Sequence, residues 1–170
     1  ICRKYLELRY RLMPYLYTAV RECHDTGMPI MRALWLHDPT DVVGAARGDE
    51  YLWGRDILVS PVVEKGAATR RLYLPRGAWF DFWTGERIDG GREIDRAVDL
   101  ETMPLHVRAG TILPLGPIKQ YVDEPVDGLG QRRVRHQHGL GEVAHRVTVA
   151  VGQRPQDPPL LDADLLVGQR

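Results

Sequence analysis

The sequence predicts a mainly β protein, in which an antiparallel β-sandwich follows one long α-helix and precedes an irregular C-terminal tail. Apolar residues recur with a helical period near the start of the chain and with a period of two through its middle. No aromatic residue follows Tyr121, so the tail lacks the usual fillers of a sandwich core. We therefore divide the chain of 170 residues into a helix (1–28), a sandwich (29–127) and a tail (128–170).

The first segment carries the strongest helical pattern. A stripe at spacings of three and four is formed by Leu8, Leu12, Leu16, Ala19 and Cys23. Four more apolar side chains broaden this stripe: Tyr5, Leu6, Met13 and Tyr17. We therefore expect the helix to be buried on more than one side. Pro14 should kink the helix or restart it as a first-turn residue, and Gly27 should end it.

Short apolar runs separated by glycine, proline and aspartate fill the middle segment. We expect strands at Ile30–Leu36, Ile57–Val63, Arg70–Leu74, Ala78–Trp83, Pro104–Arg108 and Thr111–Leu115. Typical turn pairs such as Thr84-Gly85 and Ala109-Gly110 separate them. Since no helical pattern lies between these runs, an antiparallel sandwich is favoured over a parallel sheet of βαβ units.

The composition argues against several classes of partner. The 23 basic and 23 acidic residues cancel, so net charge gives no attraction to nucleic acid or to an anionic membrane. No apolar run approaches the roughly 20 residues of a membrane-spanning helix. Cys2 and Cys23 would lie about 30 Å apart on one continuous helix, too far for a disulfide, so we expect two free thiols. The compartment stays undecided, with the cytoplasm slightly favoured.

Four blocks in the first 127 residues stand out together. They are RYRLMPYLYTA (Arg9–Ala19), GMPIMRAL (Gly27–Leu34), the run Tyr51–Glu86 that begins YLWGRDILVSPV, and MPLHVRAGTILPLG (Met103–Gly116). In this order and spacing they resemble the C-terminal part of glycoside hydrolase family 31, the α-glucosidase and α-xylosidase group. The resemblance implies that the first helix is the last helix of a truncated (β/α)8 barrel and that the sandwich follows that barrel.

The resemblance also implies an activity for a longer parent protein. Family members are retaining exo-acting glycosidases, in which one carboxylate is the nucleophile and a second is the acid/base. Both are aspartates on loops of earlier barrel strands, and no position of this sequence matches those motifs. We therefore assign no catalytic, cofactor-binding or metal-binding residue and no cofactor. We expect an oligo- or disaccharide substrate to bind through the missing barrel, and the segment alone to be inactive.

The tail departs from the family pattern. After Asp127 members continue with strands rich in Tyr, Phe and acidic residues, whereas this sequence reads GLGQRRVRHQHGLGEVAHRVTVAVGQRPQDPP. Arg, Gly, Gln, Val and Pro without aromatic residues are expected when a GC-rich gene is translated out of frame. We therefore expect a frameshift near Gly128, and a tail that is partly disordered or forms one loosely attached hairpin.

The aromatic residues of one expected strand, Trp79, Phe80, Phe82 and Trp83, admit two interpretations. Aromatic faces stack on sugar rings, so these residues are candidates for a carbohydrate platform. On a strand, however, the two tryptophans share one face and the two phenylalanines share the other. We favour a strand packed on both sides, with core aromatics.

Acidic and histidine residues offer weak candidates for catalysis or metal binding. Three acidic pairs lie close in sequence: Asp49-Glu50, Asp99 with Glu101, and Asp123-Glu124. A catalytic dyad needs carboxylates that converge across a pocket, so we expect solvated loop charges instead. Three histidines gather in the tail: His136, His138 and His145. Without cysteines nearby they do not predict a metal site.

Three further polar residues are expected to have no catalytic role. His106 lies between Leu105 and Val107 in an expected strand and should point away from the core, toward a surface or interdomain hydrogen bond. His24 should lie at the carbonyl end of the first helix. Ser60 precedes a proline in an apolar run and has no nucleophile motif around it.

The alternative to a glycosidase fragment is a free-standing β-sandwich that binds carbohydrate or protein without catalysis. The first helix discriminates between the two, since a self-sufficient sandwich has no use for a helix that is apolar on several faces. Trp35 and Trp53 are assigned to packing, at the seam with the barrel. Substrate preference and oligomeric state lie outside what the sequence predicts.

Overall fold

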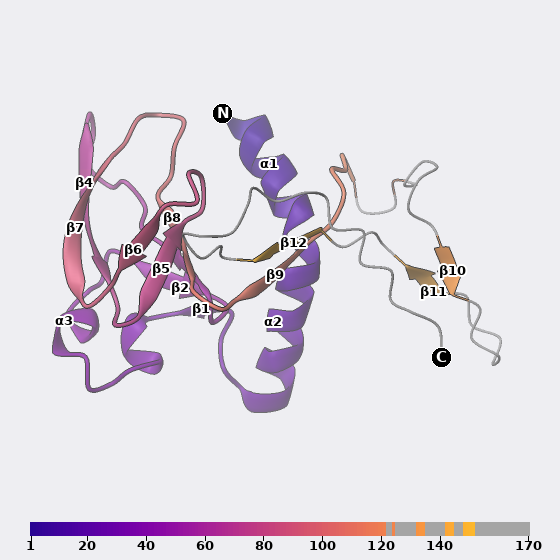
Figure 1. The fold of residues 1–170 in the computed structure, drawn as a ribbon, viewed down its shortest axis with the longest axis horizontal. Coiled ribbons are helices and arrows are strands. Elements are labelled where there is room, and N and C mark those ends of the chain that lie inside the picture. The colour runs from indigo at the N-terminus through magenta and orange to yellow at the C-terminus, as the bar shows by residue number, and fades with distance from the viewer. Residues whose placement is uncertain (122–123, 125–131, 135–141, 145–147, 152–170) are drawn as a thin grey trace.

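The computed structural model describes residues 1–121, 124, 132–134, 142–144 and 148–151. Three layers follow one another in Figure 1: a two-stranded sheet, a central six-stranded sheet, and a pair of helices with β9 beside them. The sheets are antiparallel throughout. The coarse prediction, a mainly β fold built of antiparallel sheets, is confirmed, whereas the single long helix expected before it is not observed.

The expected first helix is divided in two at Leu12. Helix α1 spans Cys2–Arg11 and helix α2 spans Met13–Thr26. Pro14 lies in the first turn of α2, where its missing N–H costs nothing. Gly27 ends α2 with a left-handed φ of 75° and donates its N–H to the Cys23 carbonyl at 2.9 Å. The predicted restart at Pro14 and the stop at Gly27 are therefore confirmed.

The central sheet has the strand order β1-β2-β3-β8-β5-β6. Its strands are β1 (Met31–Arg32), β2 (Tyr51–Trp53), β3 (Ile57–Val59), β8 (Leu105–Arg108), β5 (Ala78–Asp81) and β6 (Arg87–Asp89). The strand expected at Ile30–Leu36 is wrong beyond Arg32, because only two residues of β1 pair with the short β2. The chain then turns through the 3-10 helix η1 (Leu34–Leu36) and helix α3 (Val42–Ala45).

A two-stranded sheet covers one face of the central sheet. It consists of β4 (Thr69–Leu74) and β7 (Arg92–Ala97), which pair along their whole length. Leu72 and Leu74 of β4 pack against Leu52, Leu58 and Trp79 of the central sheet, all almost fully buried. The sequence did not predict β7, because REIDRA carries charges at most positions and contributes only its isoleucine to this core.

The helices cover the opposite face of the central sheet. Leu12 and Tyr15 pack there against Ile57, Val59 and Leu105. Strand β9 (Ile112–Leu115) belongs to the same core and joins α1 through a hydrogen bond from the Gly116 amide to the Arg11 carbonyl at 2.7 Å. Burial on both faces explains why the central strands read as continuous apolar runs.

Tyr15 attaches α2 to the turn between β2 and β3. Its hydroxyl donates to the Trp53 carbonyl at 2.8 Å and accepts from the Asp56 amide at 3.2 Å. Burial raises the pKa of Tyr15 to about 12, so this hydroxyl keeps its proton at neutral pH. Gly54 has a φ of 65°, and a Cβ there would collide with the Tyr15 ring. Only glycine satisfies both the turn and this close approach.

Three short strands of the tail are also described. Strand β12 (Thr148–Val151) pairs antiparallel with β9, and β10 (Arg132–Val134) pairs with β11 (Glu142–Ala144). The predicted frameshift and partial disorder concern residues that lie mostly outside those described, and they stay predictions.

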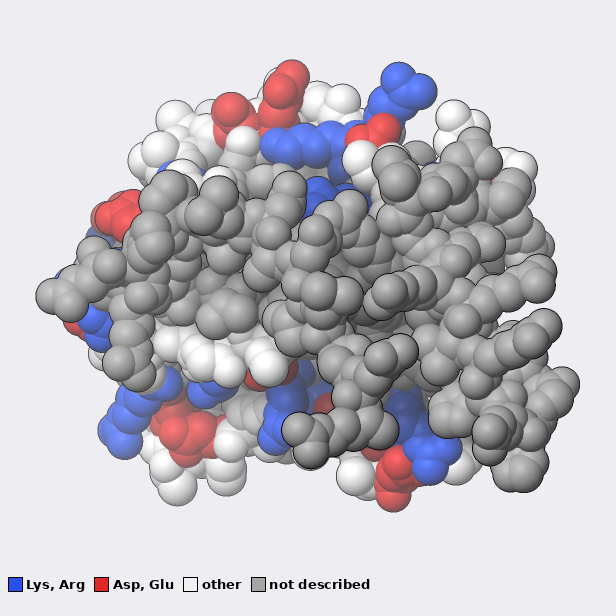
Figure 2. Space-filling model, turned by 45° about the vertical axis from the view of Figure 1, so that its right-hand side comes forward, with Lys and Arg blue, Asp and Glu red and all other residues white. Residues whose placement is uncertain are grey.

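The surface and the thiols agree with the composition. Figure 2 shows acidic and basic side chains interspersed along the margins of one face, among the residues coloured there. Cys2 and Cys23 are free thiols, as predicted. Among the described residues, no helix combines the length and the apolar character needed to cross a bilayer.

We expect Tyr15→Phe to lower the free energy of unfolding by about 1–3 kcal/mol, because it leaves the partly buried Asp56 amide without its acceptor and the Trp53 carbonyl without its donor. Urea denaturation measures the change. Tyr17→Phe is the matched control, since the Tyr17 side chain is 78% exposed and should change stability by less than about 0.5 kcal/mol. Equal effects of the two variants would contradict the role of the Tyr15 hydroxyl.

Candidate functional site

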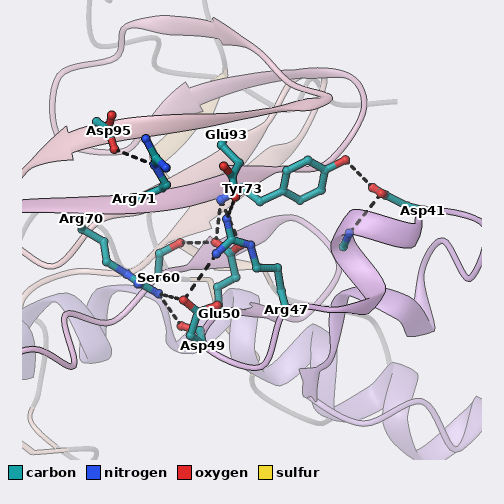
Figure 3. A network of polar contacts seen from close by, with 11 residues as sticks. Asp41, Arg47, Asp49, Glu50, Ser60, Arg70, Arg71, Tyr73, Glu93 and Asp95 are labelled. Atoms are coloured by element: carbon teal, nitrogen blue, oxygen red, sulfur yellow. Dashed lines mark hydrogen bonds and ion pairs between the residues drawn. The ribbon is translucent and has the colours of Figure 1, made fainter.

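A network of polar side chains joins the segment before β2 to strands β4 and β7 (Figure 3). Glu50 lies at its centre with a fully buried side chain. Its carboxylate accepts from the Ser60 hydroxyl at 3.0 Å and from the Tyr73 amide at 3.0 Å. The Arg47 guanidinium lies 3.5 Å from it. Burial raises the pKa of Glu50, although these hydrogen bonds and Arg47 oppose the rise.

Two arginines tie the same segment to the outer sheet. Arg47 forms an ion pair with Glu93 of β7. Arg70 of β4 donates to the Asp49 carboxylate at 2.6 Å and to the Asp49 carbonyl at 3.0 Å. Burial alone would raise the pKa of Asp49, but the hydrogen bond and charge of Arg70 hold it below its usual value. The segment before β2 is therefore fixed by charge as well as by packing.

Tyr73 extends the network to helix α3. Its hydroxyl donates to the Asp41 carboxylate at 2.7 Å, and the other oxygen of that carboxylate accepts from the Gly44 amide at 3.1 Å, which caps α3. Burial, together with Asp41, raises the pKa of Tyr73 to about 12. Asp41 thus binds the sheet and holds the start of α3 at the same time.

The centre of this network has no access for a substrate. Ser60 is fully buried and Glu50 is 4% exposed. The prediction of solvated charges at Asp49-Glu50 is wrong for Glu50. The reason is that β4 lies across the start of β2, so Glu50 receives the Tyr73 amide where the sequence suggested a solvent-exposed loop. We interpret the arrangement as structural, because the Ser60 hydroxyl already donates its hydrogen bond to the Glu50 carboxylate.

The other acidic candidates remain loop charges. Asp99 and Glu101 are both exposed, and the Asp99 carboxylate accepts from the Glu101 amide at 2.9 Å. This confirms the prediction for that pair. Glu124 is half-buried, whereas Asp123 lies outside the described residues.

The aromatic strand β5 is packed on both sides, as we favoured. Trp79 is fully buried in the core beneath β4. The expectation that the two tryptophans share a face is wrong, because β5 ends at Asp81 and both Phe82 and Trp83, which follow it, pack against the helix-side core. The Lys4 ammonium lies 4.2 Å from the Trp83 ring centroid, and the Tyr5 ring meets it edge-on at 6.0 Å. These contacts leave no open aromatic platform on β5 for a sugar.

His106 is buried, so the prediction that it faces a surface is wrong. It lies in β8 between Leu58 of β3 and Asp81 of β5, beneath an ion pair between Asp81 and Arg96 at 2.9 Å. Leu105 and His106 of β8 are both buried, so the two faces of this strand are covered at His106. Burial lowers the pKa of His106 to about 4, against the pull of Asp81, and the imidazole is neutral at physiological pH.

A second buried charge, which sequence reasoning missed, joins α2 to β1. Arg32 is 1% exposed and donates to the Glu22 carboxylate at 2.6 Å and to the Pro29 carbonyl at 2.7 Å. A further nitrogen of Arg32 lies 3.2 Å from His37 Nε2. The hydrogen bond from Arg32 lowers the pKa of Glu22. An arginine inside the apolar run PIMRAL was the available signal.

The remaining candidates are not brought together. His24 is exposed at the end of α2 and contacts Asp25 at 3.0 Å, in the position expected from the helix dipole. His136, His138 and His145 lie outside the described residues. Among the residues that the structure does describe, no group of three His, Cys, Asp or Glu is placed to hold a metal ion.

Comparison with known proteins identifies the family to which this sequence is similar. The model of the glycosyl hydrolase family 31 C-terminal domain matches residues 27–113. The chain belongs to glycoside hydrolase family 31. This confirms the resemblance drawn from the sequence blocks, and it assigns the sandwich to the domain at the C-terminal end of family members.

Named relatives in this family act on α-linked sugars. "Alpha-glucosidase 2" of Bacillus thermoamyloliquefaciens is 38% identical over 74% of this chain, and the "Alpha-xylosidase" of Saccharolobus solfataricus is 42% identical over 66% of it. A family 31 dextranase of Flavobacterium johnsoniae, solved in complex with glucose, is 47% identical over 71% of this chain with a TM-score of 0.70.

The chain is similar to only a small part of each relative. It covers 16% of the length of each of these two curated proteins and 15% of the dextranase chain.

We expect Glu50→Gln to change how stability depends on pH. Burial raises the pKa of Glu50, so the folded state favours its protonated carboxyl. The resulting stability is fully present below the ordinary pKa of glutamate and is lost as pH rises through the raised value. Glutamine cannot ionise and avoids that loss. Urea denaturation should therefore show that the free energy of unfolding of Glu50→Gln, relative to the wild type, is higher at about pH 7 than at about pH 4.

Asp49→Asn is the matched control of opposite sign. The lowered Asp49 pKa gives stability that is present above the ordinary pKa of aspartate and lost as pH falls. The free energy of unfolding of Asp49→Asn, relative to the wild type, should therefore fall as pH rises. If Glu50→Gln behaves like Asp49→Asn, the ion pair with Arg47 outweighs burial and our assignment is wrong.

Proposed function

We propose that this chain is the C-terminal support of a retaining exo-α-glycosidase that hydrolyses α-glucosides or α-xylosides. Membership of family 31 and the named α-glucosidase and α-xylosidase relatives support this class of substrate. In this proposal α1 and α2 form the last helix of a (β/α)8 catalytic barrel, and the sandwich packs behind it.

The single observation that carries the proposal is a second apolar face on the helix pair. Leu6, Tyr17 and Val20 are 55%, 78% and 45% exposed, and together we call them the outer stripe. Leu12, Tyr15 and Ala19, on the inner side, are buried against the sandwich. At about 100° per residue the two sets lie on opposite sides of the helix. An uncovered apolar stripe on a helix indicates a missing partner, here the rest of the barrel.

In the whole enzyme, the role proposed for this segment is structural support of the catalytic barrel. Retaining hydrolysis needs two carboxylates about 5 Å apart on either side of the scissile bond, and these would come from the barrel. The inner face of the helices bonds to the sandwich through Tyr15 and through the Glu22–Arg32 ion pair. The sandwich would thereby fix the position and tilt of the last barrel helix, and with it the loops that line the substrate pocket.

The alternative, a free-standing sandwich that binds carbohydrate or protein, has less support. Its best candidate surface was the aromatic strand, in which Trp79 is fully buried and Trp83 is covered by Lys4 and Tyr5. A binding module would also leave the outer stripe without a purpose.

The outer stripe should make the isolated chain bind a hydrophobic dye and self-associate. The triple variant Leu6→Ser, Tyr17→Ser, Val20→Ser should lose most of the dye fluorescence, because the apolar surface is removed without touching the inner face. Val42→Ser with Val43→Ser, also exposed but on α3, is the matched control and should keep it. A monomeric wild-type chain that binds no dye would contradict the proposal.

The chain alone should release no p-nitrophenol from p-nitrophenyl α-glucoside or α-xyloside above the buffer rate, because it lacks both carboxylates of the mechanism. A colorimetric assay of the purified 170-residue chain measures this. The assignment of a purely supporting role would be contradicted by turnover that co-elutes with the chain on size-exclusion chromatography and scales with its concentration.

A further inference from the structure

A hollow of about 510 Å³ lies where three turns meet, away from the outer stripe. The turns are the one after η1, the one between β2 and β3, and the one between β8 and β9. The residues around it are His37, Arg55, Asp56, Arg108, Ala109, Gly110, Thr111 and Ile112. We call it the basic hollow, because two guanidinium groups and one imidazole surround a single carboxylate.

Arg108 is held in place by an aromatic ring instead of an acid. Its guanidinium carbon lies 4.8 Å from the centroid of Trp79. That ring is fully buried and is itself fixed by a hydrogen bond from its Nε1 to the Pro75 carbonyl at 2.7 Å. Stacking uses the face of the guanidinium and leaves the N–H donors at its edge for another partner. No ion pair between Arg108 and an acid is found among the described residues.

His37 lines the hollow as a neutral ring. Burial, followed by the charges of Arg32, Arg108 and Arg55, lowers the pKa of His37, so the ring is uncharged at neutral pH. Arg32 can only donate, so His37 Nε2 accepts its hydrogen bond at 3.2 Å. The proton of the neutral ring therefore lies on Nδ1, which is a donor.

The one carboxylate of the hollow does not neutralise it. The Thr111 hydroxyl bonds to the Asp56 side chain, and burial raises the pKa of Asp56 against the pull of Arg55, Thr111 and Arg108. Arg55 is exposed and, like Arg108, forms no ion pair within the described part of the chain. Arg32, just behind the hollow, is matched by Glu22. Two guanidinium charges against one carboxylate leave the hollow with a positive excess.

We propose that the basic hollow binds a small oxyanion, carboxylate or phosphate, through the edge of Arg108 with support from Arg55 and His37. Both anions present coplanar oxygens at the spacing of a guanidinium fork, which permits two parallel charge-assisted hydrogen bonds. This proposal is drawn from the two arginines and His37 around the hollow alone. It does not depend on the supporting role assigned above.

Isothermal titration of the 170-residue chain tests the site, with inorganic phosphate in one arm and acetate in the other, each at constant ionic strength kept with chloride. We expect saturable one-site binding in at least one arm. Saturation by phosphate alone assigns the tetrahedral anion, and saturation by acetate alone assigns the carboxylate.

Arg108→Gln should weaken that binding about tenfold or more, since one bidentate charged contact is lost. Arg55→Gln, at an exposed position that folding tolerates, should weaken it severalfold and keeps the test valid if Arg108→Gln fails to fold. Arg92→Gln is the matched control: Arg92 is an exposed arginine of β7 whose Nε donates to the Asp89 carbonyl, and its loss should leave the affinity unchanged. Binding that does not saturate in either arm, or that falls equally in Arg92→Gln, overturns the proposal.

Discussion

Burial of the central six-stranded sheet on both faces is the constraint on which the rest of this structure depends. One face meets β4, and the other meets α1, α2 and β9. Removal of either layer would return a row of leucine, isoleucine, valine and tryptophan side chains to water, at about 25 cal/mol for each Å² exposed. The helices are therefore part of the sandwich core, although they precede it in the chain.

The same constraint decides the fate of the polar residues that the strands carry inward. Glu50, Arg32 and His106 are almost completely buried, and a buried charge without a partner costs several kcal/mol. Glu50 is matched by two donors and Arg47, and Arg32 by Glu22. His106 instead avoids a buried charge, since burial keeps its imidazole neutral beside the Asp81–Arg96 ion pair. Glu50 and Arg32 each connect elements that are separate in sequence, so their polar contacts specify the register that the apolar layers leave less defined.

Local rules predicted the elements whose causes are local. Pro14 and Gly27 mark the helix boundaries because the first lacks an N–H and the second tolerates a positive φ. Alternation located β4, β5 and β8, and double-sided burial of β5 followed from its aromatic residues. Strand β7 escaped prediction because it is an outer strand with one inward isoleucine.

The errors at the candidate site share one physical origin. His106 was expected in solvent because it alternates with Leu105 and Val107 on its strand, and Glu50 because adjacent acidic residues in a loop are usually solvated. Their burial comes from β4 and β7, which approach from elsewhere in the chain. Arg32 and Arg108 likewise acquire their roles from Glu22 and Trp79, which no local spacing could have paired with them.

The interlock of Tyr15 with Gly54 has a consequence for where this domain begins. The family signature starts at residue 27, immediately after α2. A polypeptide cut at that point would keep the left-handed glycine but lose the ring that fills the space beside it, along with Leu8 and Leu12 of the helix-side core. The first residue matched by the family model and the first residue of this packing unit thus differ by two helices. Gene fusions or exchanges that respect only the former would separate residues that must fold together.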